Sequence, residues 1–541
     1  MAAPVNLPDP LPADPAVLER LAADLVQQDQ LLPALRVYDR LIDLGAATEA
    51  TWCATGNALS ELGEYAQAIG AYEHSLRCQP NNPEAHHDLG RVLYKLGDAD
   101  RAANHLEQAA GQCDLLQPWQ SLATIIPGCP GSGPERILEI RQAFVSRLMA
   151  EMPVREPERR AVAGSGSRLR VGYLSAHFHL SHYMKPVWGL INRHDRNAFE
   201  VQLFCDSPAA AGLPGYVRHP RDRVHDTAGL DNDELAELIR ASGVQILVDL
   251  SAYSVPQRLP LFTRRVAPVT IAWFNAFATS GLPGFDYIVG DERVVYHGEE
   301  RFFTETILRL PMSYLTFEVT HSAPPVGPPP CLQNRYLTFG SLVAQYKITP
   351  PVLDAWAEIL RRSDGTRLLL ANTALRSVHN RSYVCERFAE RGVDAERLIL
   401  EGPAEHFAYL EKYSRIDVAL DAFPYNGGTT TMEAIWQGVP VLTFAGDRWA
   451  SRTSPSLLHD TPLRAFVAAD VRSEIERAVE LARDPATSAR LAALRGQLRS
   501  SLQNSPACNV GALARGMECL YQTVWHGLLV GRVAAAGTAN Q

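Results

Sequence analysis

Small and apolar residues recur at a spacing of 34 positions near the start of this chain. The two matching sets are Gly56, Leu59, Leu62, Gly63, Ala68 and Gly90, Leu93, Leu96, Gly97, Ala102. A fainter first copy begins near Asp14, and "QPNNPEA" at 79–85 separates two copies. A repeat of this length is typical of paired helices, which bury their apolar faces only by stacking on neighbouring pairs. The period therefore predicts a stack of helical hairpins.

The spacing resembles that of tetratricopeptide repeats. We expect residues 14–150 to form such repeats together with connecting helices. About three units are close to the minimum for a stable stack, and two interpretations stay open. The repeats are either a structural cap on the next domain or a concave surface for a protein partner.

Strands and helices alternate beyond residue 168. Residues 152–168 are rich in proline, glycine and charge and are interpreted as a linker, and a proline-rich break lies at 322–331. Short apolar runs predict buried strands within 169–178, 199–207, 244–251, 268–277, 336–341, 366–372, 397–402, 416–423 and 440–447. This alternation is typical of parallel sheets. We therefore expect two Rossmann-like domains, at 168–320 and 333–530.

Composition excludes several classes of function. The 541 residues include 51 basic and 60 acidic ones, a net charge of −9, which argues against nucleic acid as the main partner and leaves local basic patches open. The nine cysteines form no CxxC pair, so a zinc ribbon is not indicated and a reducing compartment fits. No basic segment with an apolar core opens the chain, and no run is long enough for a bilayer. We expect a cytoplasmic protein with no membrane span.

The stretch "DAFPYNGGTTTMEAIWQGVP" at 421–440 is a strand, a loop and a helix start. Gly427 and Gly428 are expected to turn their N–H groups outward, and Thr429, Thr430 and Thr431 add hydroxyls at a helix N-terminus, where an anion is favoured. This reading predicts a phosphate site. The competing interpretation is a capping box between Thr430 and Glu433, with the glycines as a plain turn.

Other nucleotide and metal motifs are missing. The sequence has no GxGxxG after the first strand of either set and no GxxxxGK[ST], which disfavours dinucleotide and P-loop sites and favours a sugar nucleotide. Asp231 and Asp233 in "DND" are better explained as helix caps than as metal ligands. We therefore predict no bound metal.

The motifs "RLRVGYLSAHF", "ILVDLSAYS", "AQYKITP" and the 421–440 stretch, in this order, resemble the catalytic region of the bacterial O-GlcNAc transferase family. The N-terminal repeats are similar to that family's architecture. The resemblance implies a helical repeat region followed by a GT-B enzyme of two Rossmann-like domains. It also implies an inverting, metal-independent transfer of N-acetylglucosamine from UDP-GlcNAc to protein serine or threonine hydroxyls, with the acceptor recruited in part by the repeats.

Two alternatives to this activity stay open. The donor could be another nucleotide sugar, GDP-fucose or UDP-glucose. The chain could instead be a repeat-containing adaptor that binds a nucleotide sugar without turnover.

The resemblance also implies roles for particular residues. Lys347 would be the cation that stabilises the departing diphosphate. Glu433, expected in the first helical turn, would accept hydrogen bonds from the ribose hydroxyls. His406 would lie near the uracil. The donor-binding set is completed by Gln345, Gly427, Gly428, Thr429 and Thr430. Animal members carry histidine at the position of Gly428 and aspartate at that of Glu433, so the sugar pocket is expected to differ.

A histidine is also expected to act as the base toward the acceptor hydroxyl, because imidazole titrates near neutral pH. The loop "AHFHLSHYM" offers His177 and His179, and the alignment does not decide between them. His182 is expected to pack in the fold, and Tyr253 is a weaker candidate.

Overall fold

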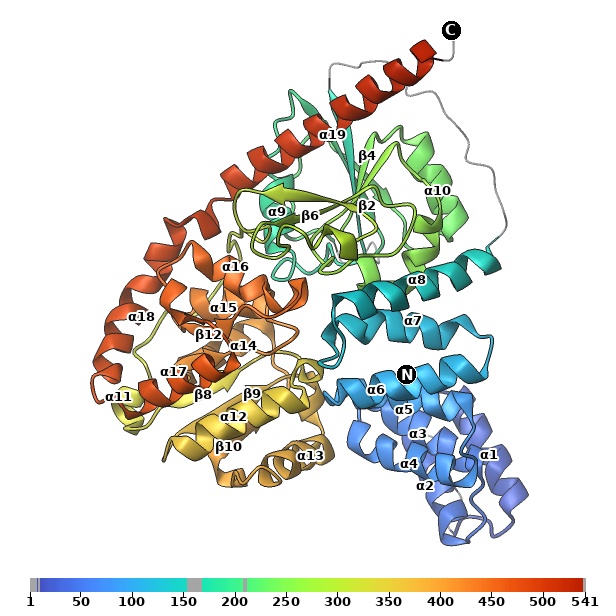
Figure 1. Cartoon of the computed structure of the whole chain (residues 1–541). Helices are drawn as coiled ribbons and strands as arrows, with labels where there is room; N and C mark the ends of the chain where they lie inside the picture. The colour runs from blue at the N-terminus through green and yellow to red at the C-terminus, as the bar shows by residue number, and fades with distance from the viewer. Residues whose placement is uncertain (1–6, 8–9, 153–167, 208–211, 539–541) are drawn as a thin grey trace. The chain divides into compact units, whose positions relative to one another are not determined.

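The computed structural model describes residue 7 and residues 10–152, 168–207 and 212–538 (Figure 1). The interior of the predicted linker, residues 153–167, lies outside the described residues. The chain divides into two compact units. The first unit comprises Met1–Gly131 and Tyr336–Glu405, and the second comprises Ser132–Arg335 and His406–Gln541.

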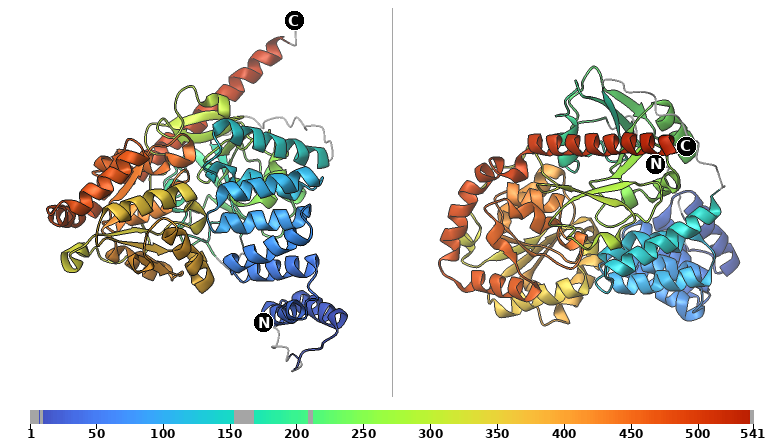
Figure 2. Two further views of the ribbon diagram at one scale, coloured as in Figure 1. Left: turned by 60° about the horizontal axis from the view of Figure 1, so that its bottom comes forward. Right: turned by 45° about the horizontal axis from the view of Figure 1, so that its top comes forward.

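Helix pairs open the first unit and stack on one another, as the two views of Figure 2 show. They are α1 (Pro15–Gln27) with α2 (Leu31–Asp43), α3 (Glu49–Glu61) with α4 (Tyr65–Cys78), and α5 (Pro83–Lys95) with α6 (Ala99–Gln112), followed by α7 (Leu116–Ile125). A methyl group on Gly56 would lie 2.6 Å from the Tyr72 ring, and one on Gly90 would lie 2.8 Å from the Leu106 side chain. The 34-residue glycine spacing therefore marks the points where paired helices touch, and the repeat prediction is confirmed.

The first sheet belongs to the second unit and orders its strands β3-β2-β1-β4-β5-β6-β7, with every paired strand parallel. The strands are β1 (Leu169–Ser175), β2 (Phe199–Cys205), β3 (Arg223–Asp226), β4 (Ile246–Asp249), β5 (Val269–Ala272), β6 (Tyr287–Asp291) and β7 (Thr306–Leu310). The associated helices are α8 (Pro134–Glu151), α9 (Lys185–Ile191) and α10 (Asn232–Ala241). Asp231 caps α10 in a capping box with Glu234, so the capping interpretation of "DND" is confirmed.

The last helix of the described chain, α19 (Val510–Thr538), packs on the first sheet's domain (Figure 1). Its Tyr521 hydroxyl lies 3.1 Å from that of Tyr173 in β1, and Glu518 contacts His194 at 2.9 Å. Residues near the end of the chain thus complete a core that begins at residue 169.

The second sheet orders its strands β10-β9-β8-β11-β12-β13. They are β8 (Thr338–Ser341), β9 (Arg367–Ala371), β10 (Leu398–Glu401), β11 (Val418–Leu420), β12 (Val441–Phe444) and β13 (Val467–Ala468). The helices are α11 (Cys331–Asn334), α12 (Pro350–Arg362), α13 (Val378–Ala389), α14 (His406–Glu411), α15 (Thr429–Trp436), α16 (Thr453–His459), α17 (Val471–Arg483) and α18 (Thr487–Gln503). A helix lies between every two successive strands of the second sheet, whereas in the first sheet no described helix separates β2 from β3 or β5 from β6. The parallel strand pairs with helices between them, together with the match to a solved structure, confirm the expected Rossmann-like class.

Every predicted strand is present, but each is shorter than its apolar run. The run 268–277 forms a strand only over Val269–Ala272, because the residues after it turn into a loop at the carboxyl end of the sheet. Ligands of parallel sheets bind at this end. Strands β3, β6, β7 and β13 were not predicted, and β3 is largely exposed, so it lacks the apolar signal.

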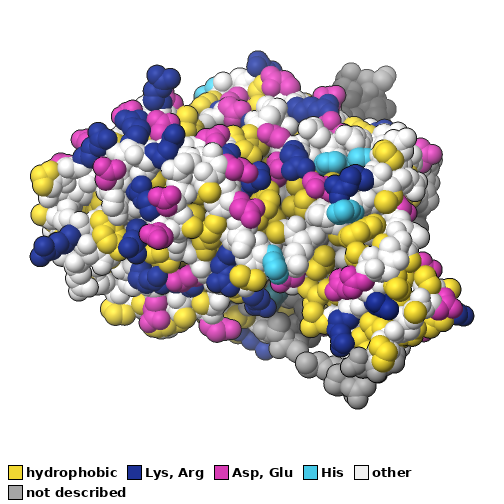
Figure 3. Space-filling view, turned by 90° about the horizontal axis from the view of Figure 1, so that it is seen from below, with side chains coloured by type: hydrophobic (Ala, Val, Ile, Leu, Met, Phe, Trp, Pro, Cys, Tyr) yellow, Lys and Arg dark blue, Asp and Glu magenta, His cyan; other side chains and the backbone are white. Residues whose placement is uncertain are grey.

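Two surface properties bear on partners. No helix of the described residues is long and apolar enough to cross a membrane. On the face seen in Figure 3, acidic and basic side chains are interspersed.

Candidate functional site

Helix α15 starts at the glycine–threonine corner, in the second unit. Gly428 is its N-cap residue, and no side chain caps the helix there. The capping box proposed between Thr430 and Glu433 does not form, and Glu433 lies beyond the first turn rather than in it. Amide groups at an uncapped helix start favour an anion, because they and the helix dipole carry partial positive charge.

The two glycines of the corner have different surroundings. The Gly427 N–H donates to Asp421 Oδ1 at 2.8 Å, and its carbonyl accepts from Ser454 Oγ at 2.9 Å. The expectation that both glycine N–H groups face a ligand is therefore wrong for Gly427. A methyl group there would lie 2.5 Å from the Thr431 hydroxyl, whereas one on Gly428 would meet only ordinary contacts, the nearest at 3.7 Å. Gly427 builds the corner, and Gly428 borders the open helix end.

A buried ion pair links this corner to the first sheet's domain. Lys185 Nζ, at the start of α9, lies 3.0 Å from Glu433 Oε1, and the two side chains are 2% and 5% exposed. Lys185 also donates to the His182 carbonyl, and Tyr409 hydrogen-bonds to Glu433. Burial raises the pKa of Glu433, while Lys185 and Tyr409 oppose this shift. Both partners of the pair lie within the second unit.

Three histidines surround the pair. His406 stacks on His182 with ring centroids 4.2 Å apart, and His321 meets His406 edge-on at 4.7 Å. Burial, followed by nearby positive charge, lowers the pKa of His182 to about 4 and that of His406 to about 3. Both rings are therefore neutral near pH 7. His182, for which we expect a structural role, packs against the His406 ring.

Several ring nitrogens here are buried without a hydrogen-bond partner among the described residues: His179 Nδ1, His321 Nε2 and His406 Nε2. His406 Nε2 lies 3.8 Å from Glu433 Oε1, which is too long for a hydrogen bond. Buried polar atoms in proteins are normally satisfied. His406 Nε2 lies beside Glu433, where a bound polar ligand would satisfy it.

His177 is oriented by a neighbouring loop. Strands β1 and β4 are paired, so the residues that follow them, including His177 and Ser254, meet at one edge of the sheet. His177 Nε2 lies 3.1 Å from Ser254 Oγ, and that hydroxyl donates to the Ser251 carbonyl. The Nε2–H of His177 therefore donates a hydrogen bond to Ser254 Oγ, and we assign Nδ1 as the basic nitrogen of His177.

Tyr253 has a structural role. Its hydroxyl donates to the Ser280 carbonyl at 2.8 Å, and the guanidinium of Arg141 lies 3.9 Å from its ring centre. The side chain is buried, so its polar group is already used inside the fold.

Gln345 and Lys347 lie in the first unit, on a short 3-10 helix, Gln345–Lys347. Gln345 is buried, and its Oε1 accepts from Asn372 Nδ2 at 3.1 Å. Tyr346, between them, stacks on Tyr94 of α5. The segment that carries Lys347 is thus packed against the repeats.

The other predicted site residues lie in the second unit: His177, His179, His406, Gly427, Gly428, Thr429, Thr430 and Glu433. Glu433 and His406 are brought together by the fold. Lys185 was missed by sequence reasoning. Its one signal is a lone charge in the otherwise apolar run "YMKPVWGLI", since an unpaired lysine is rarely buried.

The chain has two Rossmann-like domains and a helix N-terminus suited to binding a phosphate. These are the features of the GT-B class of glycosyltransferases. The sequence pattern of glycosyl transferase family 41 matches residues 147–321 and 331–517, and that of the TPR repeat matches 56–109. The chain belongs to glycosyl transferase family 41.

Two plant proteins that this chain matches are longer than the chain itself. A barley protein named probable UDP-N-acetylglucosamine–peptide N-acetylglucosaminyltransferase SPINDLY is 31% identical over 367 residues, which are 66% of this chain and 38% of that protein. An Arabidopsis thaliana protein, the corresponding SEC enzyme by name, is 27% identical over 379 residues, 67% of this chain and 38% of that one. The chain thus spans well under half the length of these relatives.

A solved structure matches almost the whole chain. It is a lysine-to-methionine mutant of the Thermobaculum terrenum O-GlcNAc transferase, 30% identical with a TM-score of 0.78, and the match covers 95% of this chain and 98% of that one. The predicted architecture, helical repeats followed by a GT-B fold, is confirmed by this match.

Proposed function

We propose that this protein transfers N-acetylglucosamine from UDP-GlcNAc to serine or threonine hydroxyls of proteins, with inversion at the sugar carbon and without a metal. The observation that carries the proposal is the uncapped start of α15 beside the buried Glu433. The helix start suits a diphosphate, and an acceptor-only carboxylate suits a ribose diol. The names of the family relatives support this donor and this kind of acceptor.

In this scheme the acceptor oxygen attacks the anomeric carbon while UDP leaves with developing negative charge. Amides of Gly428, Thr429 and Thr430 stabilise that charge, and Lys347 supplies the cation that the family resemblance implies. A histidine takes the proton of the attacking hydroxyl. His177 is the better candidate, because Ser254 orients its ring.

Binding of the nucleoside uses the residues around the ion pair. Glu433 accepts from the ribose hydroxyls, and the His406 ring and its unpartnered nitrogen face the uracil. Gln345, packed beside Asn372, completes the donor site in this proposal. The repeats contribute to recruitment of the protein acceptor. The lack of a nucleic-acid partner is part of the same proposal and is supported by the net charge of −9. A cytoplasmic location is also part of it and is supported by the nine cysteines, which form no CxxC pair.

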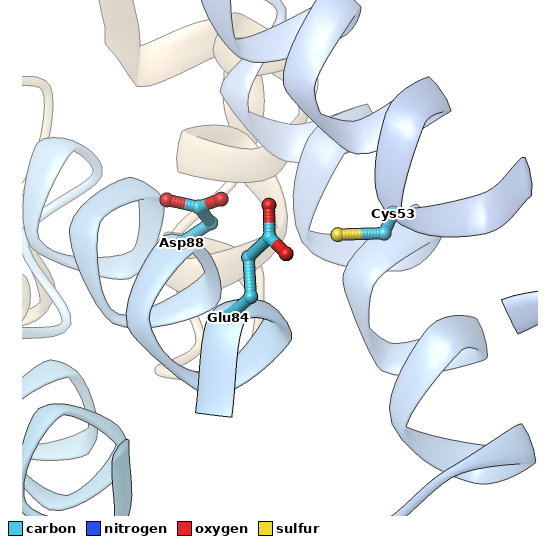
Figure 4. A group of neighbouring side chains, drawn as sticks. All are labelled: Cys53, Glu84 and Asp88. Carbon is cyan, nitrogen blue, oxygen red and sulfur yellow. The ribbon is translucent and has the colours of Figure 1, made fainter. Parts of the chain in front are cut away.

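No metal is required in this scheme. Among the described residues one group has metal-ligand character: Cys53 of α3 with Glu84 and Asp88 of α5, whose ligand atoms lie within 4.8 Å of one another (Figure 4). Burial, and then the carboxylates, raise the pKa of Cys53 to about 12. The thiol therefore keeps its proton at neutral pH, and a metal ion would have to displace that proton to bind there.

The test is calorimetry of the full chain with UDP and UDP-GlcNAc in excess chelator, followed by mass spectrometry of a serine/threonine peptide incubated with each donor. GDP-fucose and UDP-glucose serve as competing donors. We expect binding without metal and peptide mass gain with UDP-GlcNAc. A mass gain only with another donor would overturn the donor assignment, and binding without any turnover would favour the adaptor alternative.

A further inference from the structure

Lys185 occupies an unusual place for a lysine. It is the first residue of α9, and its ammonium is enclosed by the Glu433 carboxylate and the His182 carbonyl, with the side chain 2% exposed. A charge buried this deeply is costly unless its partner is present. The contact joins residues 248 positions apart, so neither local helix structure nor chain proximity requires it.

The pair determines what kind of ligand group can bind at Glu433. The lysine donates to Oε1 and Tyr409 donates to the same carboxylate, yet an ionised carboxylate offers about four acceptor positions. The unused positions can accept hydrogen bonds but cannot donate them. The Lys185 ammonium donates to Glu433 and does not point at the uncapped N-terminus of α15. A ligand that approaches Glu433 must therefore bring donors, as a pair of adjacent hydroxyls does.

We infer that Lys185 is a positioning residue for the donor: it holds Glu433 as an oriented carboxylate that recognises the ribose hydroxyls, and it does not bind the diphosphate. This inference rests on the proposed function, because it assigns a ribose-bearing donor to the site.

The electrostatics of the cluster agree with this geometry. Burial raises the pKa of Glu433, and the charge of Lys185 is the first influence that opposes it. The same charge contributes to the lowered pKa values of the three facing histidines, His182, His321 and His406. Without the ammonium, the carboxyl group would hold a proton to higher pH and lose an acceptor position.

The experiment compares UDP with 2′,3′-dideoxy-UDP, which lacks both ribose hydroxyls, by calorimetry on the full chain. Lys185→Met keeps most of the side-chain volume and removes the charge. We expect its affinity for UDP at pH 7 to fall about tenfold or more, while its affinity for the dideoxy nucleotide stays within about twofold of the starting value. The lost affinity should return as the pH rises toward 9, because Glu433 then ionises. Arg193→Met, which breaks the exposed Arg193–Glu318 pair, is the matched control and should change neither affinity.

Three results would overturn the inference. In the first, Lys185→Met binds UDP as the starting protein does. In the second, it loses both nucleotides equally, which would place Lys185 on the diphosphate or in general folding. In the third, the pH series shows no recovery.

A double variant covers the case in which Lys185→Met does not fold. Lys185→Met with Glu433→Gln removes both buried charges, and such neutral replacements are often tolerated. If Lys185 acts through Glu433, the double variant should show the same loss of ribose discrimination as Glu433→Gln alone. A further loss in the double variant would contradict the inference. Failure of the unmodified protein to bind UDP would be a different result, since it would overturn the proposed function itself.

Discussion

The Tyr94 ring of the repeats stacks on Tyr346, the residue before Lys347, with ring centroids 5.1 Å apart and planes inclined by 19°. Next to this contact, Gly97 lies against the Ile348 carbonyl so closely that a methyl group would come within 2.2 Å of its oxygen. The end of α5 and the turn after it thus contact Tyr346 and Ile348, the residues before and after Lys347. We expect the repeats to support the Lys347 segment as well as to bind an acceptor.

Gly97→Ala tests this contact, with Gly63→Ala as its control. Both glycines have positive φ, +95° and +80°, and occupy the same position in successive repeats, but nothing lies within 4 Å of a methyl group on Gly63. Each substitution should cost about 1 kcal/mol of backbone strain. Only Gly97→Ala should also displace the Lys347 segment and lower the peptide transfer rate by about tenfold. Equal rates in two folded variants would show that the contact does not support catalysis.

Lys347→Ala should remove a charge-assisted contact to the departing diphosphate. The expected cost is about 3 kcal/mol, or about two powers of ten in rate. Donor hydrolysis and peptide transfer should fall together, because both release UDP. The two rates measured on the same preparation check this, and a fully active variant would show that the role implied by the family resemblance does not apply to Lys347.

His177→Ala should slow transfer to a hydroxyl about a hundredfold or more while leaving UDP affinity near its starting value. His179→Ala should transfer at close to the starting rate, because no described side chain orients its ring in the way that Ser254 orients His177. Burial lowers the pKa of His177, so the base stays unprotonated below the ordinary histidine range. The acid limb of kcat/KM should accordingly lie below pH 6.5, the ordinary pKa of histidine. If both variants transfer normally, the proton leaves by another route.

Gly427→Ala and Gly428→Ala should differ in their affinity for UDP. A methyl group on Gly427 would collide with the hydroxyls of Thr430 and Thr431, so the corner must shift and UDP affinity should fall about tenfold or more. The same group on Gly428 meets only ordinary contacts with the protein, so the corner should keep its shape and UDP affinity should fall less than in Gly427→Ala. Calorimetry with UDP measures both, and thermal melting separates loss of fold from loss of the site. Equal affinities would mean that the corner is not held as tightly as its contacts indicate.

Glu474 on α17 gives a prediction about stability. Its two carboxylate oxygens are buried without a hydrogen-bond partner in the described structure, and burial, then the charge of Asp421, raises its pKa well above the ordinary value. The folded state therefore keeps a proton that the unfolded chain releases, so stability declines as pH rises above the ordinary glutamate range. Glu474→Gln removes this decline. Its free energy of unfolding relative to the starting protein should rise between pH 5 and pH 8, by up to about 1.4 kcal/mol per pH unit.

Exposed Glu480 on the same helix is the control, and Glu480→Gln should show no such trend. Denaturant unfolding at the two pH values measures the difference. A constant offset for Glu474→Gln would mean that Glu474 is ionised in the folded protein.

Periodic patterns in the sequence were enough to predict the repeats, the alternating strands and the corner at 421–440. Each of these depends on neighbours in the chain: glycine at every thirty-fourth position where helices of one repeat touch, and apolar runs that a parallel sheet buries on both faces. Local chemistry also located Gly428 and Thr429 at a helix start, since backbone geometry there follows from nearby residues.

The tertiary structure alone decided which distant side chains meet. The Lys185–Glu433 pair, the stacking of His182 on His406 and the contact of Tyr94 with Tyr346 all join segments far apart in sequence. It also showed that the backbone of Gly427 hydrogen-bonds to Asp421 and Ser454, so its N–H is not directed at a ligand. Such pairs leave no periodic signal, because burial and charge balance are properties of the folded chain. The sequence by itself determined the elements and their order, and the packing of those elements determined the electrostatics of the site.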